Sequence, residues 1–299
     1  MQYDFSTQQK MLEATISLLE DFNIKDVSAL GGGTALAIYW NHRFSTDIDV
    51  FIFGEDSYVN KMQPKNWTEK TTKIFNDIGF KDDFKINPFY TEFAITEDEK
   101  IQLFDSKSFT GNNHFKQENI WGIDFNIESI EEIIAKKIFY RCEKFNARDI
   151  FDISIAINKN PLILKTLLEA NSKFKEKFEL FETKLETLII SEDKLEDYKK
   201  DIAEMMPHYT YQFLQELSPN YLYSIFQETN TAIAYNMFDD EVCIEIENIA
   251  FKEFFENNNH LDELLKNHEA SLENNQILEV SRDDIKEDTQ NKSIIRRYK

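Results

Sequence analysis

Two aspartates follow a run of three glycines in the first fifth of the chain. The glycines are Gly31, Gly32 and Gly33, and the aspartates are Asp47 and Asp49. Adjacent glycines let the backbone approach a ligand and present N–H groups to an anion. Residues two apart on a strand share a face, so the two carboxylates repel each other unless a cation lies between them. Carboxylates and substrate phosphates together suit Mg²⁺, and also Mn²⁺. The pattern therefore predicts a site for a triphosphate and a divalent metal.

A strand and a helix must position these residues. The segment VSALGGGTALAIYW predicts a short strand, the glycine turn and a helix that starts near Thr34, and TDIDVFIF predicts a buried strand. The positive end of the helix would point to the same place as the glycines. Either motif alone is more often a plain turn or an exposed strand start. Together they are specific, because the helix between them returns the chain to the turn. The other phosphate motifs, GxxxxGK[ST] and GxGxxG, do not occur.

The remaining chain predicts an α+β protein, with a small mixed sheet and flanking helices followed by a helical domain. Helices are expected over residues 6–22 and 67–78, and antiparallel strands at FKINPFY, TEFAITE and KIQLFDS, with WGIDFNI as one more strand. From residue 130 the spacing is mostly helical, and Val242 to Ile249 could be a strand or a helix. We expect a catalytic domain over 1–127 and a mainly helical domain over 128–299, with the site between them.

Composition limits the classes of protein that fit. Of the 299 residues, 41% are hydrophobic and 14% aromatic, which is ample for a core. The net charge of −21 repels nucleic acid at long range, so RNA would need a local basic patch or bridging metal ions. Cys142 and Cys243 lie far apart and indicate reduced thiols. The sequence has neither a long apolar run nor a signal peptide pattern, which predicts a cytoplasmic protein with no membrane partner.

The stretch GGGTALAIYWNHRFSTDIDVF resembles the signature of the DNA polymerase β-like nucleotidyltransferase superfamily. More narrowly, it is similar to the AbiEii/AbiGii toxin family of bacterial type IV toxin–antitoxin and abortive-infection pairs. That family shows GGTxL and then R-x-S-x-D-[IL]-D-[FL], which residues 32–36 and 43–50 fit, with Val50 as a mild departure. The resemblance implies Mg²⁺-dependent transfer of a nucleotide from an NTP to a hydroxyl acceptor. The acceptor would be the 3′ end of tRNA or a protein, and a cognate antitoxin would be a partner.

The resemblance also implies a role for each matching residue. Asp47 and Asp49 would be catalytic metal ligands. Arg43 and Ser45 would orient the strand or touch phosphate, and Arg43 could instead pair with one of the aspartates. The residues expected to hold the nucleotide's phosphates form the turn and the helix start: Gly32, Gly33 and Thr34.

A second part of the family pattern is a helical lysine followed about eleven residues later by R-D-x-x-D. Lys137 stands eleven residues before Arg148 and so fits better than Lys136. Asp149 and Asp152 are three apart and share a helical face. Lys137 could neutralise charge on the leaving group, and Arg148 could bind the nucleotide. Asp149 could accept a proton from the attacking hydroxyl or orient Lys137 or Arg148. An ion-paired helix hairpin between domains is the plain alternative.

Members of the superfamily usually supply a third carboxylate from a neighbouring strand. Asp105, at the end of KIQLFDS, is the predicted third metal ligand, although a solvated strand end would look the same. Asp124 is a weaker candidate. The alternative function is an NTP-binding interaction protein that has lost turnover. The feature that discriminates between the two functions is the third carboxylate: if neither Asp105 nor Asp124 reaches the face of Asp47 and Asp49, catalysis becomes doubtful.

Overall fold

The computed structural model describes residues 3–54, 57–160, 163–191, 193–194, 197–198 and 200–201. The chain divides into two compact units, residues 2–139 and the residues from 140 onward. The division falls twelve residues beyond the predicted boundary between residues 127 and 128 (139 − 127). The predicted element from Val242 to Ile249 lies outside the described residues.

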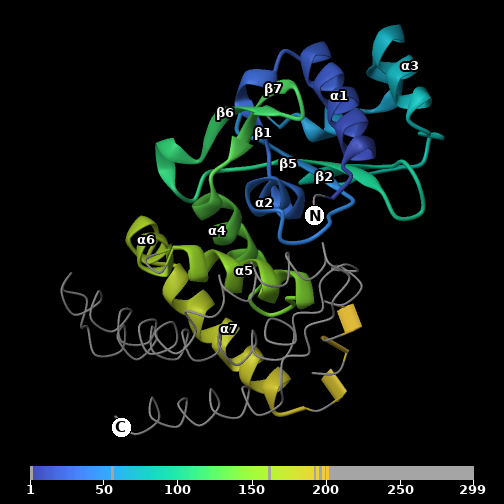
Figure 1. The fold of residues 1–299 in the computed structure, drawn as a ribbon. Coiled ribbons are helices and arrows are strands. Elements are labelled where there is room, and N and C mark those ends of the chain that lie inside the picture. The colour runs from blue at the N-terminus through green and yellow to red at the C-terminus, as the bar shows by residue number, and fades with distance from the viewer. Residues whose placement is uncertain are drawn as a thin grey trace, which may run out of the picture. The chain divides into compact units, whose positions relative to one another are not determined.

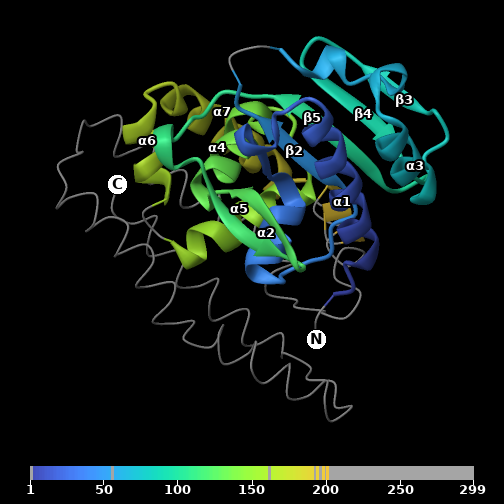
Figure 2. The same cartoon turned by 90° about the horizontal axis from the view of Figure 1, so that it is seen from above.

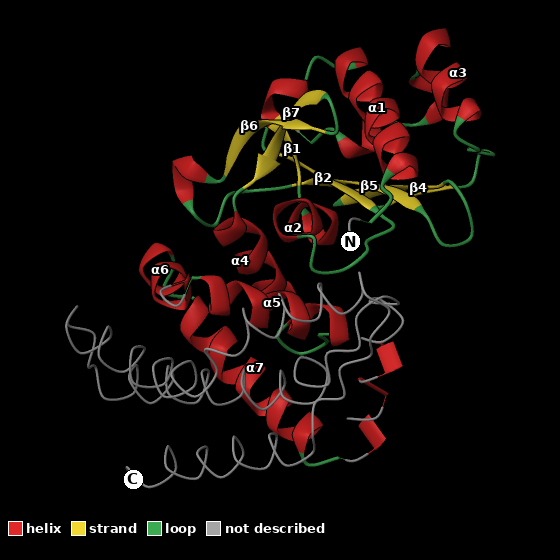
Figure 3. Ribbon diagram, in the orientation of Figure 1, coloured by secondary structure: helices red, strands yellow, loops and turns green. Residues whose placement is uncertain are grey.

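A mixed sheet of seven strands forms the centre of the first unit (Figure 3). The strand order is β3-β4-β5-β2-β1-β7-β6. The central strand β2 is antiparallel to β1 and parallel to β5, and β1 is parallel to β7. This mixture of directions confirms the predicted α+β class. The strands are β1 (Ser28–Leu30), β2 (Ile48–Ile52), β3 (Phe84–Ile86), β4 (Tyr90–Ala94), β5 (Lys100–Asp105), β6 (Phe115–Ile120) and β7 (Ile123–Glu128).

The two outer parts of the sheet are antiparallel. Strands β3, β4 and β5 form the predicted antiparallel run. Strand β7 is the predicted WGIDFNI strand, and it forms a hairpin with β6. The sequence analysis missed β6, because the segment FKQENI has four polar residues and only its last residue is buried.

Helices cover both faces of this sheet. Helices α1 (Ser6–Asp21) and α3 (Glu69–Asp77) lie on one face, above the sheet in Figure 1, and Figure 2 shows α1 in front of β2 from that side. Helix α2 (Gly32–Trp40) lies on the opposite face, and α4 (Ile130–Arg141) follows β7. Both α1 and α3 occur where helical spacing predicted them.

The core of the first unit lies between the sheet and the pair α1 and α3. Every second residue of β2, namely Ile48, Val50 and Ile52, is at most 1% exposed. Burying a side chain of this size stabilises the fold by about 1.5–3 kcal/mol. Beside them, Trp67 packs on Phe75 with ring centroids 4.2 Å apart. The face of β2 that carries Asp49 is therefore the face turned away from this core.

The second unit is helical over its described residues, as predicted. It contains α5 (Ala147–Lys159), α6 (Ile163–Ala170) and α7 (Phe174–Ile189). Phe151, Phe174, Phe178 and Phe181 are fully buried and form its apolar centre. None of the described helices is both long and apolar enough to span a membrane.

Candidate active site

The glycine turn joins the end of β1 to the start of α2. The Gly31 N–H donates to the carbonyl oxygen of Asp49 at 2.8 Å, which continues the pairing of β1 with β2 by one residue. Gly32 follows with φ of +64°, a conformation that residues with a Cβ rarely adopt. The turn therefore starts beside the second aspartate.

Each of the three glycines is closely approached by a charged side chain. A Cβ on Gly31 would collide with Oε2 of Glu128, and a Cβ on Gly32 would collide with Oδ2 of Asp49. A Cβ on Gly33 would collide with Nη2 of Arg43. All three separations would be under 3.0 Å, which real Cβ atoms essentially never show. The glycines are needed because charged groups occupy the space where their side chains would be.

Strand β2 carries the second aspartate on the face opposite the core. Burial alternates along the strand, so Asp49 and Phe51 share one face while Ile48 and Val50 share the other. Asp47 lies directly before β2 and is half-buried, two residues from Asp49. Across the sheet, Asp49 lies opposite Gln102 of β5.

Three of the predicted phosphate-binding residues are buried and bonded within the protein. The Thr34 hydroxyl is 2.9 Å from Oγ of Ser45 and also donates to the carbonyl oxygen of Asp47. Arg43 donates from Nη1 to the carbonyl oxygen of Phe44 at 2.9 Å. Thr34, Ser45 and Arg43 are 0%, 8% and 2% exposed. These contacts hold the segment before β2 against α2. They fit the first of the two roles expected for Arg43 and Ser45, which is to orient the strand.

The amino end of α2 is available to an anion. Its N-cap is Gly31, which has no side chain to cap the helix. The first N–H groups of a helix have no partner inside the helix, and they carry the positive end of its dipole. Gly32, the first residue of this helix, lies beside the carboxylate of Asp49.

The structure does not bring Asp105 to the two aspartates. Strands β2 and β5 pair Asp49 with Gln102 and Ile52 with Asp105, so Asp105 points to the opposite face from Asp49. Its carboxylate accepts hydrogen bonds from the Ser57 hydroxyl at 2.5 Å and the Tyr58 N–H at 3.1 Å. The expectation that Asp105 is the third carboxylate therefore fails, because a residue three positions beyond Gln102 cannot share its face.

Asp124 does not reach the aspartates either. It is exposed near the β6–β7 turn, where its Oδ1 accepts a hydrogen bond from Asn119 at 2.8 Å. It precedes Glu128 by four residues on β7, which is about 13 Å along a strand. Of the two candidates that the sequence offered for a third carboxylate, Asp105 therefore lies on the other face of the sheet and Asp124 lies too far along β7.

Glu128 is the carboxylate that does approach the glycine turn. Leu30 lies opposite Val50 on one side and opposite Ile127 on the other. One residue further, Gly31 lies between Asp49 and Glu128. The sequence analysis missed Glu128 because it precedes an acidic helix start, ESIEE, and resembles a part of it. Extending the alternation of WGIDFNI by one residue would have found it.

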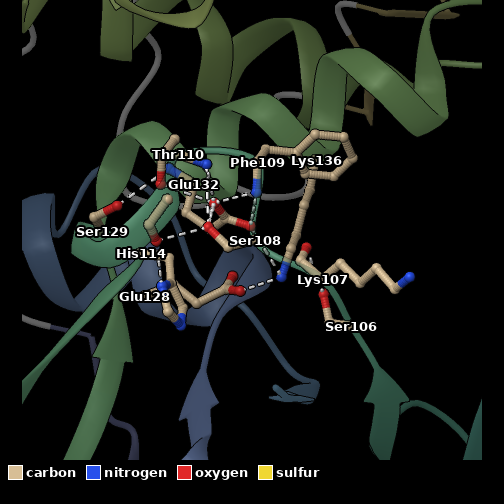
Figure 4. Close-up of polar contacts among 11 residues, drawn as sticks. Ser106, Lys107, Ser108, Phe109, Thr110, His114, Glu128, Ser129, Glu132 and Lys136 are labelled. Carbon is tan, nitrogen blue, oxygen red and sulfur yellow. Dashed lines mark hydrogen bonds and ion pairs between the residues drawn. The ribbon is translucent and has the colours of Figure 1, made fainter. Parts of the chain in front are cut away.

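A buried lysine binds one oxygen of Glu128 (Figure 4). Nζ of Lys136 contacts Oε1 of Glu128, and the two side chains are 7% and 0% exposed. The same ammonium lies 3.6 Å from the centre of the Phe51 ring and 4.7 Å from that of Phe53. The other oxygen of Glu128, Oε2, is buried and has no hydrogen-bond partner among the described residues.

Burial raises the pKa of Glu128 to about 8. The positive charge of Lys136 opposes this shift, whereas the negative charges of Glu132 and Asp49 add to it. A cation placed near Oε2 would favour the ionised carboxylate.

Glu132, one turn before Lys136 on α4, fixes the loop after β5 (Figure 4). Its fully buried carboxylate accepts hydrogen bonds from the N–H groups of Phe109 and Thr110 at 2.9 and 3.0 Å. It also lies 3.6 Å from Nζ of Lys136. Glu128, Lys136 and Glu132 thus form one buried cluster, hereafter the β7–α4 cluster.

The residues of the second family pattern lie in both units. Lys137 is half-buried on α4, in the first unit. Arg148 is exposed on α5, in the second unit, and Asp149 is 3% exposed. Asp149 and Asn146 form a capping box: the Asp149 N–H donates to Oδ1 of Asn146 at 3.0 Å, and the Asn146 N–H donates to Oδ2 of Asp149 at 3.1 Å. The buried Asp149 therefore has a structural task at the start of α5.

The groups on the face of β2 that carries Asp49 decide whether the residues present fit a divalent cation. Among the described residues, no three His, Cys, Asp or Glu side chains are already arranged around a metal position. Mg²⁺ is commonly held by one or two carboxylates plus substrate phosphates and water. The unpartnered buried Oε2 of Glu128 and the carboxylate of Asp49 lie against neighbouring glycines. These donors fit a cation whose coordination is completed by a nucleotide.

Comparison with known proteins finds a family that part of the chain resembles. Residues 17–103 match the family model described as nucleotidyl transferase AbiEii toxin, type IV TA system. The matched segment contains the glycine turn, Arg43, Ser45 and both aspartates. No curated protein matches the sequence.

Solved structures share parts of the architecture. A candidate nucleotidyltransferase from Helicobacter pylori is 16% identical with a TM-score of 0.42, and covers 78% of this chain and 98% of its own. The protein JHP933 from the same organism is 15% identical with a TM-score of 0.41, over 77% and 96% of the two chains. An antigenic nucleotidyltransferase-like protein from Paracoccidioides brasiliensis is 17% identical with a TM-score of 0.34, over 57% and 92%. These likenesses are too weak to support a function. Residues 17–103, which contain the motif, are thus similar to the nucleotidyl transferase AbiEii toxin family of type IV toxin–antitoxin systems.

Proposed function

We propose that the protein transfers a nucleoside monophosphate from an NTP to a hydroxyl acceptor, with Mg²⁺ as the metal and Mn²⁺ as its substitute. One observation carries the proposal: the carboxylate of Asp49 lies directly against Gly32, at the uncapped amino end of α2. Groups for a metal ion and groups for a phosphate therefore lie side by side. A nucleotide bridging them would be held with its phosphates beside the metal.

The residues of the turn would share the work of binding the nucleotide. The N–H groups of Gly32 and Gly33 would donate to phosphate oxygens. Asp47 and Asp49 would hold Mg²⁺, which when bound supplies charge to stabilise the attacking and leaving oxygens. The residues that keep this arrangement rigid would be Thr34, Ser45 and Arg43, whose buried contacts fix the segment before β2.

Three further residues have proposed roles from the family pattern. Lys137 would neutralise charge on the departing pyrophosphate, and Arg148 would bind a phosphate of the nucleotide. Asp149 would accept the proton of the attacking hydroxyl, beside its contact with Asn146.

The proposed acceptor is the 3′ end of tRNA. The family resemblance supports it, and a nucleotide-terminated RNA offers the hydroxyl that the reaction needs. The net charge of −21 opposes long-range attraction of RNA, so a protein hydroxyl is the alternative acceptor. The family is one of toxin–antitoxin pairs, and we propose that a cognate antitoxin restrains the enzyme.

Label transfer tests this function. The purified protein would be incubated with each NTP labelled at the α-phosphate, with Mg²⁺, and with either total tRNA or RNase-treated cell extract. We expect one acceptor fraction to gain label, and chelation by EDTA to stop the reaction. Asp49→Ala should abolish the transfer, whereas the control Asp105→Asn should keep it. Persistent transfer by Asp49→Ala would show that the chemistry takes place elsewhere.

A further inference from the structure

We propose that Glu128 is the third carboxylate of the metal site and approaches it from β7, on the far side of the glycine turn from Asp49. The inference rests on the proposed function, because it takes the metal ion to lie at Asp49. It assigns to β7 the carboxylate that the sequence analysis sought on β5.

The strand register supports this placement. From Asp49 outward on one side, the neighbour is the neutral side chain of Gln102 on β5, and β4 then presents Glu92. The Glu92 carboxylate is already held by hydrogen bonds from Lys85 and Gln102. On the other side the neighbour is Gly31 of β1, which has no side chain, and the next strand presents Glu128. The absent side chain of Gly31 leaves room for Oε2 of Glu128 to lie over the turn. Glu128 is therefore the acidic residue in this row that can approach Asp49 across the turn.

The two oxygens of Glu128 have different surroundings. Oε1 contacts Lys136, whereas Oε2 is buried and has no hydrogen-bond partner among the described residues. A buried oxygen left without a partner is unfavourable, and such atoms in native proteins usually bind a ligand, water or ion. Oε2 is the oxygen that lies against Gly31, so the ligand position is on the side of the turn.

The charges near this position also favour a cation. The β7–α4 cluster contains two carboxylates, on Glu128 and Glu132, and one ammonium, on Lys136. Glu132 is satisfied by the N–H groups and hydroxyl of the loop that it fixes. When both acids are ionised, one negative charge remains in excess, and Asp49 adds another beside the turn.

Lys136 is a positioning residue in this arrangement. Its ammonium holds Oε1 of Glu128 and lies over the rings of Phe51 and Phe53. These contacts keep Glu128 in one orientation, with Oε2 directed to the glycines. Lys136 itself does not need to touch the nucleotide.

Mn²⁺ binding measured by electron paramagnetic resonance tests the inference without any turnover. The full chain would be titrated with Mn²⁺ in the presence of a non-hydrolysable ATP or GTP analogue. Glu128→Gln keeps the shape of the side chain and removes its charge, and we expect it to weaken Mn²⁺ binding by about tenfold or more. Asp105→Asn, which removes the rival carboxylate on β5, should leave the affinity within about twofold.

Asp49→Asn separates the inference from the proposed function. If Asp49→Asn weakens Mn²⁺ binding and Glu128→Gln does not, the role of Glu128 is refuted and the metal site at Asp49 stands. If neither substitution weakens binding, the proposed metal site fails as well.

A double variant guards against simple unfolding. Glu128→Gln combined with Lys136→Met removes both members of the buried ion pair, and the remaining carboxylate of Glu132 keeps its hydrogen bonds from the loop after β5. We expect this protein to unfold near the wild-type temperature and still to bind Mn²⁺ about tenfold more weakly, or worse. Wild-type affinity in a folded double variant would overturn the inference.

Discussion

The glycines of the turn have very little free space where a side chain would be. Gly32 combines a left-handed backbone with a carboxylate where a Cβ would be, whereas Gly111 has φ of +75° and no heavy atom within 4 Å of a Cβ. The two glycines share the backbone requirement and differ in their neighbours. Substitution of Gly32 and of Gly111 by alanine therefore distinguishes the effect of backbone strain from the effect of displacing the site.

We expect Gly32→Ala to reduce nucleotidyl transfer by about a hundredfold, because the added Cβ displaces Asp49, and small misplacements have costs of that size. Gly111→Ala should cost about 1 kcal/mol of stability from its backbone alone and leave transfer unchanged. Label transfer and thermal unfolding of the two variants provide the check. Equal losses of transfer in both proteins would argue against the contact with Asp49.

The ion pair of Lys136 and Glu128 gives a second prediction for single residues. Lys136→Met leaves a buried carboxylate without its countercharge and should lower the free energy of unfolding by about 3–5 kcal/mol. In the double variant with Glu128→Gln, most of that loss should be recovered, because Glu128 no longer carries a charge and Glu132 keeps its hydrogen bonds from the loop after β5. Urea unfolding followed by tryptophan fluorescence measures both. A loss below about 1 kcal/mol in Lys136→Met would mean that the pair is not buried as described.

At the scale of elements, two different roles are assigned to Asp149 at the start of α5. Asp149 completes the capping box with Asn146, and it is also the proposed proton acceptor. Asp149→Asn keeps an oxygen that can accept from the Asn146 N–H, so the cap survives in this variant.

We expect Asp149→Asn to change the free energy of unfolding by less than about 1 kcal/mol. Transfer should fall by about a hundredfold or more if the carboxylate accepts the proton. Activity near that of the wild type would leave Asp149 with the capping role alone. Rates and urea unfolding of the same preparation distinguish the two explanations.

Strands β3, β4 and β5 are tied together by Glu92. Burial raises its pKa, but the hydrogen bonds from Lys85 and Gln102 and the charge of Lys100 outweigh that effect, so the pKa lies below its ordinary value. A carboxyl whose pKa is lowered by folding stabilises the fold above its unfolded pKa, and this contribution is lost as the pH falls through the folded pKa.

The stability of wild-type protein should therefore decrease on acidification below about pH 4, partly through Glu92. We expect Glu92→Gln to reduce this pH dependence by about 1 kcal/mol or less, since Lys85 and Lys100 are largely exposed and screened. The exposed Glu97 gives the control variant Glu97→Gln. Urea unfolding at pH 7 and at pH 3.5 gives the loss of stability between the two pH values for each protein. An equal loss for Glu92→Gln and wild type would contradict the expectation.

At the scale of the whole molecule, the boundary between the units decides which segments fold together. A fragment that ends at residue 127, as the sequence suggested, would lose Glu128 and the whole of the β7–α4 cluster. A fragment that ends at residue 142 keeps α4 and the carboxylate of Glu132 that fixes the loop after β5.

We expect fragment 1–142 to unfold cooperatively and to bind Mn²⁺ with an NTP analogue, but not to transfer the nucleotide, because Arg148 and Asp149 are missing. Fragment 1–127 should be unfolded or aggregate. It lacks the buried contact of Glu128 with Lys136 and the buried contacts of Glu132 with the loop after β5. Circular dichroism on heating compares the two. Stable folding of fragment 1–127 would place the boundary where the sequence analysis put it.

The sequence by itself determined the parts of this protein that depend on local spacing. Alternating and helical patterns located α1, the glycine turn, β2 and α3, because periodicity follows from which face is buried. The pair of aspartates and the turn were found for the same reason, since they lie within about twenty residues and share one local geometry. The motif that resembles the AbiEii family lies within that stretch.

Only the tertiary structure decided which distant residues meet at the turn. Asp105 and Glu128 end different strands, and nothing in their local sequence says that β5 pairs with β2 while β7 pairs with β1. The face of each residue follows from strand register, and a shift of a single residue reverses it. The glycine turn therefore keeps the two aspartates that the sequence predicted, and long-range pairing of strands adds Glu128 beside them.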